Sequence, residues 1–89
     1  MTTVKEIEKI LRQHFCVESI RIDDESALHK GHAQAQKQGG GHFTLYIVSN
    51  DFNGKSQLER HQMINRSLKD QFKDAIHALK IKAVSPREL

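Results

Sequence analysis

The sequence predicts a single α+β domain in which a mixed three-stranded sheet is covered on one face by helices. Apolar residues recur with a helical period in two segments and with a period of two in three others. The segments follow the order helix, strand, strand, helix, strand, so a helix forms the crossover between the last two strands. A chain of 89 residues has room for one core, and we assign residues 1–89 to one domain.

Residues 3–15 and 17–23 are the first predicted helix and strand. The helix opens with Thr3 and Glu6 at the spacing of a capping box. Its apolar stripe consists of Val4, Ile7, Leu11 and Phe15. The period of two then places Ile20 and Ile22 on one face of the strand, and Arg21 and Asp23 on the other.

A segment without periodic apolar residues, 24–41, precedes the next strand. It is rich in His, Gln, Lys and Ala and ends in three glycines. Loops longer than about 12 to 15 residues in compact domains are usually functional or disordered. We therefore expect this loop to be mobile and to contribute to a functional site. The strand after it, 43–48, is apolar on both faces, which is typical of a central strand.

The second helix begins at Ser56, because Ser56-Gln57-Leu58-Glu59 is another capping box. Its inner stripe is expected to contain Leu58, His61, Ile64 or Asn65, Leu68 and Phe72. The adjacent Arg60 and His61 cannot share a helix face. The simplest interpretation makes Arg60 a surface residue and His61 a packing residue, and a binding role is the alternative.

Residues 76–84 return to strand character. Leu79 and Ile81 alternate with Lys80 and Lys82, and the same alternation places His77 on the face of Leu79. This predicts a half-buried histidine, although the start of a strand also permits exposure at the rim of the sheet. The Ser85-Pro86-Arg87-Glu88 segment would start a further helix, with proline at its first position.

The composition excludes several classes of protein. No stretch approaches the roughly 18 consecutive apolar residues that cross a bilayer, and the first residues do not resemble a signal peptide. The single cysteine, Cys16, excludes an internal disulfide and fits a reducing compartment, so we expect a cytoplasmic protein. We expect Cys16 to be a small buried residue rather than a reactive thiol. A formal charge of +3 favours anionic partners, but it is equally typical of a solvated surface of mixed charge.

Short motifs along nearly the whole chain resemble the BolA family, in order and at family spacing. They are Gly40-Gly41-His42-Phe43, Val48-Ser49, Phe52-Asn53-Gly54-Lys55-Ser56, Arg60-His61, Ile76-His77-Ala78-Leu79 and Ser85-Pro86-Arg87-Glu88. The chain departs from the family pattern at Gln62, where Arg is common, and at Ser85, where Thr is usual. It also lacks the Trp that often follows the closing Glu. The resemblance implies the BolA fold, which is similar to the class II KH domain.

The resemblance also implies a function. Members of the family bind monothiol glutaredoxins around a shared 2Fe-2S cluster, two positions of which are held by the glutaredoxin cysteine and glutathione. The other two ligands come from the loop between the first strands and from the Ile-His-Ala segment. Carried over, these are His32 and His77, with His29 and His42 as alternates to His32. Imidazole is a common ligand of such irons, but loop histidines are also often exposed without a role.

Some bacterial members of the family are DNA-binding transcriptional regulators linked to cell shape and stress, which is the rival function. It would use the basic second helix and the strand that follows. The candidate residues are Lys55, Arg60, Arg66, Lys69, Lys80 and Lys82. The chain lacks the Gly-X-X-Gly loop of RNA-binding KH domains. It also lacks a catalytic triad or a glycine-rich phosphate loop, so we predict that it is not an enzyme and has no small-molecule substrate.

Overall fold

The computed structural model describes residues 3–25, 41–73 and 76–89. It confirms the predicted order of elements. The helices and strands are α1 (Thr3–His14), β1 (Val17–Asp24), β2 (Gly41–Ser49), α3 (Gln57–Ser67) and β3 (Ile76–Val84). Three short 3-10 turns complete it: η2 (Asn50–Phe52), η3 (Gln71–Lys73) and η4 (Pro86–Glu88). The final motif thus forms one 3-10 turn.

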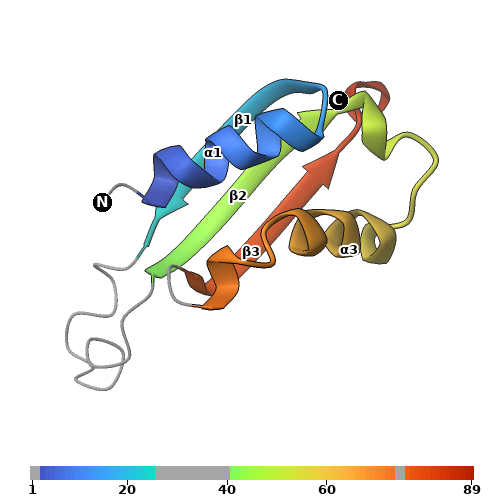
Figure 1. Cartoon of the computed structure of the whole chain (residues 1–89). Helices are drawn as coiled ribbons and strands as arrows, with labels where there is room; N and C mark the ends of the chain where they lie inside the picture. Colours follow the sequence, from blue (N-terminus) through green and yellow to red (C-terminus); the bar gives the residue numbers. More distant parts are fainter. Residues whose placement is uncertain (1–2, 26–40, 74–75) are drawn as a thin grey trace.

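The three strands form a mixed sheet in the order β1-β2-β3. The central strand β2 pairs antiparallel with β1 and parallel with β3, because α3 carries the chain back across the sheet before β3 begins. Figure 1 shows α1 and α3 on the same face of this sheet. The predicted α+β architecture, a mixed sheet with helices on one face, is therefore confirmed.

The core lies between the two helices and the sheet. It contains Ile7, Leu11 and Phe15 of the first predicted stripe, with Val4 packed against them, and the alternate residues of β2 that face the helices. The core residues are Ile7, Leu11, Phe15, Phe43, Leu45, Ile47, Phe52, Ile64, Leu68, Ile76 and Ala83. The rings of Phe15 and Phe52 pack with their centroids 5.3 Å apart. Packing of this kind holds the central strand in a fixed position.

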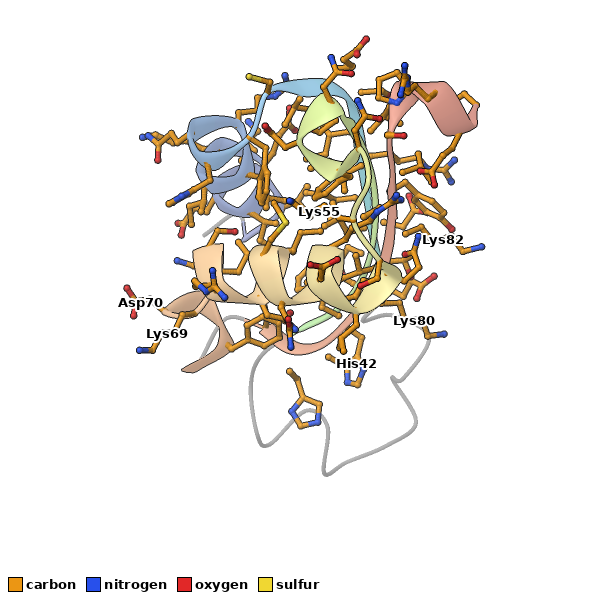
Figure 2. All side chains as sticks on the ribbon, turned by 90° about the vertical axis from the view of Figure 1, so that its right-hand side faces the viewer. His42, Lys55, Lys69, Asp70, Lys80 and Lys82 are labelled. Atoms are coloured by element: carbon orange, nitrogen blue, oxygen red, sulfur yellow. The ribbon has the colours of Figure 1, made fainter. Side chains whose placement is uncertain are left out.

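Because side chains alternate along each strand, the other residues lie on the face of the sheet that the helices do not cover. We call this the open face, and define it by Arg21, Asp23, Thr44, Tyr46, Lys80 and Lys82. Figure 2 shows Lys80 and Lys82 projecting from the sheet on the side away from α1. The open face is thus largely polar and carries cations.

The inner side of α3 differs from the predicted one. Leu58 is 67% exposed, and Phe72 beyond the helix is also exposed, whereas Arg60 is only 4% exposed. Arg60 precedes Ile64 and Leu68 by four and eight residues, which places all three on one helix face. The expectation of a surface Arg60 was wrong because its guanidinium finds acceptors inside the fold. His61 is half-buried, as a partly packed residue.

The Arg60 guanidinium joins three segments. Nε donates to the carbonyl oxygen of Lys55 at 2.9 Å, and Nη1 donates to that of Ala83 at 2.8 Å. The two terminal nitrogens also donate to the two carboxylate oxygens of Glu88, at 2.7 and 3.0 Å. Glu88 in turn accepts from the Ser85 backbone at 2.7 Å, so the arginine fixes η4 against α3 and β3. These hydrogen bonds lower the pKa of the Glu88 carboxyl from 4.5 to about 2. The bond from Arg60 has the largest effect, and the one from the Ser85 backbone comes next.

Cys16 also differs from expectation, because it is exposed. The preceding Phe15 occupies the core position, and the chain then turns into β1. The Cys16 backbone N–H donates to Oδ2 of Asp51 at 2.8 Å, and Ser49 Oγ donates to the same oxygen at 3.1 Å. The backbone of Cys16 is thus fixed by η2 while its thiol faces outward. Of the helices in the described ranges, none is long and apolar enough to span a membrane.

Candidate functional site

Two histidines from adjacent strands meet at one end of the sheet. His42 lies near the start of β2 and His77 near the start of β3, and their ring centroids are 5.0 Å apart. The His42 carbonyl accepts from the Glu25 backbone at 2.7 Å, so the ends of the long loop, residues 25 and 41, lie beside the same pair. Figure 2 labels His42 at this end of the sheet, near the bottom of the view.

A β-bulge places His77 at this position. Gly41 pairs with Ile76, but the next residue of β2, His42, pairs with Ala78, which leaves His77 as an extra residue. A bulged residue leaves the strict alternation of the strand, and bulges often redirect a side chain next to a functional site. His77 is therefore exposed and does not lie half-buried on the Leu79 face. The alternation argument failed here because a bulge is a property of the strand pairing.

The pair suits metal coordination. His42 is half-buried and takes part in further interactions. A centroid separation of 5.0 Å allows both rings to reach one metal ion, since imidazole nitrogen binds metals at about 2 Å. Within residues 3–25, 41–73 and 76–89, no group of three or more metal-binding side chains occurs. Further ligands must therefore come from elsewhere.

The structure thus brings together two of the four predicted ligand candidates, His42 and His77. The other two, His29 and His32, lie outside the described residues, as does most of the segment expected to be mobile. The choice among the three loop candidates therefore stays a prediction.

The six basic residues nominated for nucleic acid do not form one surface. Arg60 is buried in its bonds to Glu88 and the two carbonyls, so it lies apart from the exposed cations, and its contact with nucleic acid stays a prediction. Arg66 lines a cleft between α1 and α3, while Lys55 and Lys69 are exposed at opposite ends of α3. Figure 2 shows Lys69 far from Lys80 and Lys82, the two that share the open face.

The strand register adds Arg21 and Tyr46, which were not among the six nominated residues. Arg21 of β1 and Lys82 of β3 are both paired with Tyr46 of β2, which gives a row of cation, aromatic ring and cation across all three strands. The Arg21 guanidinium carbon lies 5.3 Å from the centroid of the Tyr46 ring. The strand pattern had placed Arg21 on the outer face, but only the pairing register brings it beside Tyr46.

Comparison with known proteins identifies the fold and the family. The chain matches the family described as BolA-like protein over residues 11–88. It superposes on the BolA domain of SufE1 from Arabidopsis thaliana with a TM-score of 0.83 and 36% identity, covering 96% of this chain and 93% of that one. BolA1 from the same organism gives a TM-score of 0.85 at 26% identity, covering 100% and 97% of the two chains.

Curated relatives show the same similarity. SufE-like protein 1, chloroplastic/mitochondrial, of Arabidopsis thaliana is 40% identical over 74 residues, which are 79% of this chain but 20% of that protein. The DNA-binding transcriptional regulator BolA of Vibrio cholerae is 32% identical over 82 residues, 92% of this chain and 74% of that protein. With a family match over most of its length and the BolA architecture in its structure, this chain belongs to the BolA family.

Proposed function

We propose that this chain is a non-enzymatic BolA-like adaptor that binds a monothiol glutaredoxin and shares a 2Fe-2S cluster with it. Such a protein would act in cluster assembly, cluster trafficking, or iron and redox sensing. The observation that carries the proposal is the contact between His42 and His77, with ring centroids 5.0 Å apart, beside the ends of the long loop. The family membership of the chain gives this pair its context.

Two imidazoles are a suitable donor set for a shared cluster. Histidine replaces cysteine on one iron of some 2Fe-2S centres, and this raises the reduction potential of the centre. The thiolates would come from the glutaredoxin cysteine and from glutathione. Each protein would then hold an incomplete set of ligands, which fits a cluster that passes between partners.

The residues of this chain have different tasks in the proposed complex. His77 is fixed by the bulge in β3 and is exposed, so it presents its ring to a partner without a change in the sheet. The second ligand is His32, with His29 and His42 as alternates. His42 is the candidate that packs against His77, whereas the other two belong to the loop that starts beside it.

The test is anaerobic reconstitution of the chain with a monothiol glutaredoxin, glutathione, iron and sulfide, followed by visible absorption and circular dichroism. We expect a cluster spectrum that differs from that of glutaredoxin alone. His77→Ala should abolish the mixed species, because it removes the one candidate ligand that the sheet holds exposed towards a partner. His32→Ala should weaken the species and change its spectrum, since another loop imidazole can take its place.

The matched control is His14→Ala, because His14 is also an exposed histidine but lies at the end of α1. This variant should form the mixed cluster normally. If His42→Ala forms a mixed cluster with a normal spectrum, His42 is not the second ligand, and His32 or His29 is. A normal mixed cluster on folded His77→Ala protein would contradict the assignment and the adaptor mechanism with it.

A second function, binding of nucleic acid as a regulator, has a separate observation in its favour. Lys80 and Lys82 share the open face, and the Vibrio cholerae relative is named a DNA-binding transcriptional regulator. We expect binding that is weak and steeply dependent on salt, because lysines contact phosphates without reading bases. Fluorescence anisotropy over a salt series measures it. Tight, sequence-selective binding at moderate salt would reverse the ranking of the two functions.

A further inference from the structure

We infer that the open face of the sheet binds single-stranded nucleic acid, with Tyr46 as a stacking platform and with Lys80 and Lys82 on the backbone phosphates. The inference rests on the second function proposed above, and it adds the face, the residues and the form of the nucleic acid. It begins from the row of Arg21, Tyr46 and Lys82, which spans the three strands without a gap.

Tyr46 is the aromatic residue of this row. It lies on the central strand and is 38% exposed, whereas its neighbours Leu45 and Ile47 are fully buried on the other face. The Arg21 guanidinium lies against its ring, at 5.3 Å from the centroid. Bases stack both on aromatic rings and on arginine guanidinium planes. Arg21 covers part of the ring, so a base would stack on the exposed remainder of Tyr46 or on the outer plane of the Arg21 guanidinium.

The charges of the face favour a polyanion. Arg21 is held by Asp23 through two bonds of 3.0 Å, so its charge is largely neutralised. The other acid at this face within the described residues, Glu25, accepts from Thr44 Oγ1 at 2.9 Å and keeps its charge, so the three cations of the face exceed its two carboxylates by one. Within the described residues, neither Lys80 nor Lys82 forms an ion pair. These two lysines lie about 7 Å apart along one strand, and both point to the open face.

The combination of Tyr46 with the two lysines distinguishes a single strand from other anionic ligands. An acidic peptide would use the two lysines but gains little from Tyr46. A duplex hides the faces of its bases, and sequence reading in a duplex requires a protein element that enters a groove. A single strand uses both features, because its exposed bases stack while its phosphates meet the lysines. We therefore expect single strands to bind more tightly than a duplex of the same length.

The probe is a fluorescently labelled oligothymidine, compared with a duplex of equal length, in an anisotropy titration with the full chain. Tyr46→Leu should weaken binding of the single strand roughly 5- to 150-fold, the range expected for one stacked base. Tyr46→Phe keeps the ring and should bind within about threefold of the native chain. Because Tyr46 is the one tyrosine of a chain without tryptophan, its fluorescence should also be quenched on binding.

The lysines are tested by the salt dependence. The double variant Lys80→Gln, Lys82→Gln should lower the slope of log K against log salt by about 1.4, at about 0.7 per phosphate contact of a single strand. The matched control is Lys5→Gln, Lys9→Gln, which removes the same charge from exposed positions on α1. This control should leave the slope unchanged. Asp23→Asn should tighten binding, because it releases the charge of Arg21.

The outcomes separate the inference from the function on which it rests. If nucleic acid binds but Tyr46→Leu has no effect, or if the duplex binds as tightly as the single strand, the inference is wrong while the nucleic-acid function stands. If polyglutamate competes fully and Tyr46→Leu is neutral, the face binds acidic protein. If neither form binds at low salt to a chain shown to be folded by circular dichroism, both the inference and the second function fail.

Discussion

Replacement of Arg60 by leucine tests the stabilising role that the structure gives to this residue. The substitution places an apolar side chain at a position that is 4% exposed, and it removes four hydrogen bonds donated by one guanidinium. Two of these go to backbone carbonyls, of Lys55 and Ala83. The other two go to Glu88, whose side chain is 44% exposed and therefore screened by water.

The expected loss comes mainly from the two carbonyl bonds. A net hydrogen bond to a charged group contributes about 1.5 to 3 kcal/mol, so we expect Arg60→Leu to lower the free energy of unfolding by about 3 kcal/mol. The lower part of the range applies because Gln57 Nε2 remains 3.4 Å from the Ala83 carbonyl and can satisfy it. For a domain of this size the loss corresponds to a decrease of roughly 12 to 24 °C in Tm.

Urea denaturation followed by far-ultraviolet circular dichroism, at neutral pH, measures the effect. Arg66→Leu is the matched control, since Arg66 is an exposed arginine on the same helix, and it should change the stability by less than about 0.5 kcal/mol. Glu88→Gln should cost less than Arg60→Leu, because the acceptor is half exposed and the donor is buried. If Arg60→Leu stays within about 1 kcal/mol of the native chain, the buried guanidinium does not stabilise the fold as described.

Three further outcomes follow from the geometry. The pKa of Glu88 is lowered from 4.5 to about 2. The contribution of Glu88 to stability is therefore fully present above pH 4.5 and is lost as the pH falls towards 2. In Glu88→Gln the urea midpoint should not show this part of the decrease at acid pH. Phe52→Ala removes a fully buried ring and should cost about 3 to 5 kcal/mol, whereas Phe72→Ala, at an exposed ring, should cost far less in the same assay. Gly54 has φ +73°, and no atom of the described residues lies within 4 Å of an added Cβ, so Gly54→Ala should cost about 1 to 2 kcal/mol through backbone strain. A midpoint equal to that of the native chain would contradict this.

Much of the fold was predictable because its signals are local. The capping box at Ser56 and Glu59 is present, with the reciprocal bonds at 2.8 and 3.1 Å. The helical and strand periods gave the element order, since each element buries one face. Arg60 was not predictable in this way, because its partner Glu88 lies 28 residues further along the chain and no local pattern links them.

The residues of the candidate site could be nominated from the sequence, but the geometry in which they meet could not. His77 was nominated from a motif and His42 as an alternate at the loop exit, yet their contact depends on the register between β2 and β3, which no single segment encodes. The exposure of His77 depends on a bulge in that register. Similarly, Arg21 and Tyr46 become a pair only when β1 is aligned with β2. Contacts between strands, rather than the strands themselves, were missing from the sequence analysis.

Because of the bulge, the residue at position 77 can change without a change in the packing of the fold. The extra residue is absorbed before Ala78, and from there the register continues in step from His42 paired with Ala78 to Val48 paired with Val84. A change of side chain at His77 therefore leaves the packing of the core untouched. Selection can therefore change the residue at this exposed position without first compensating for lost stability.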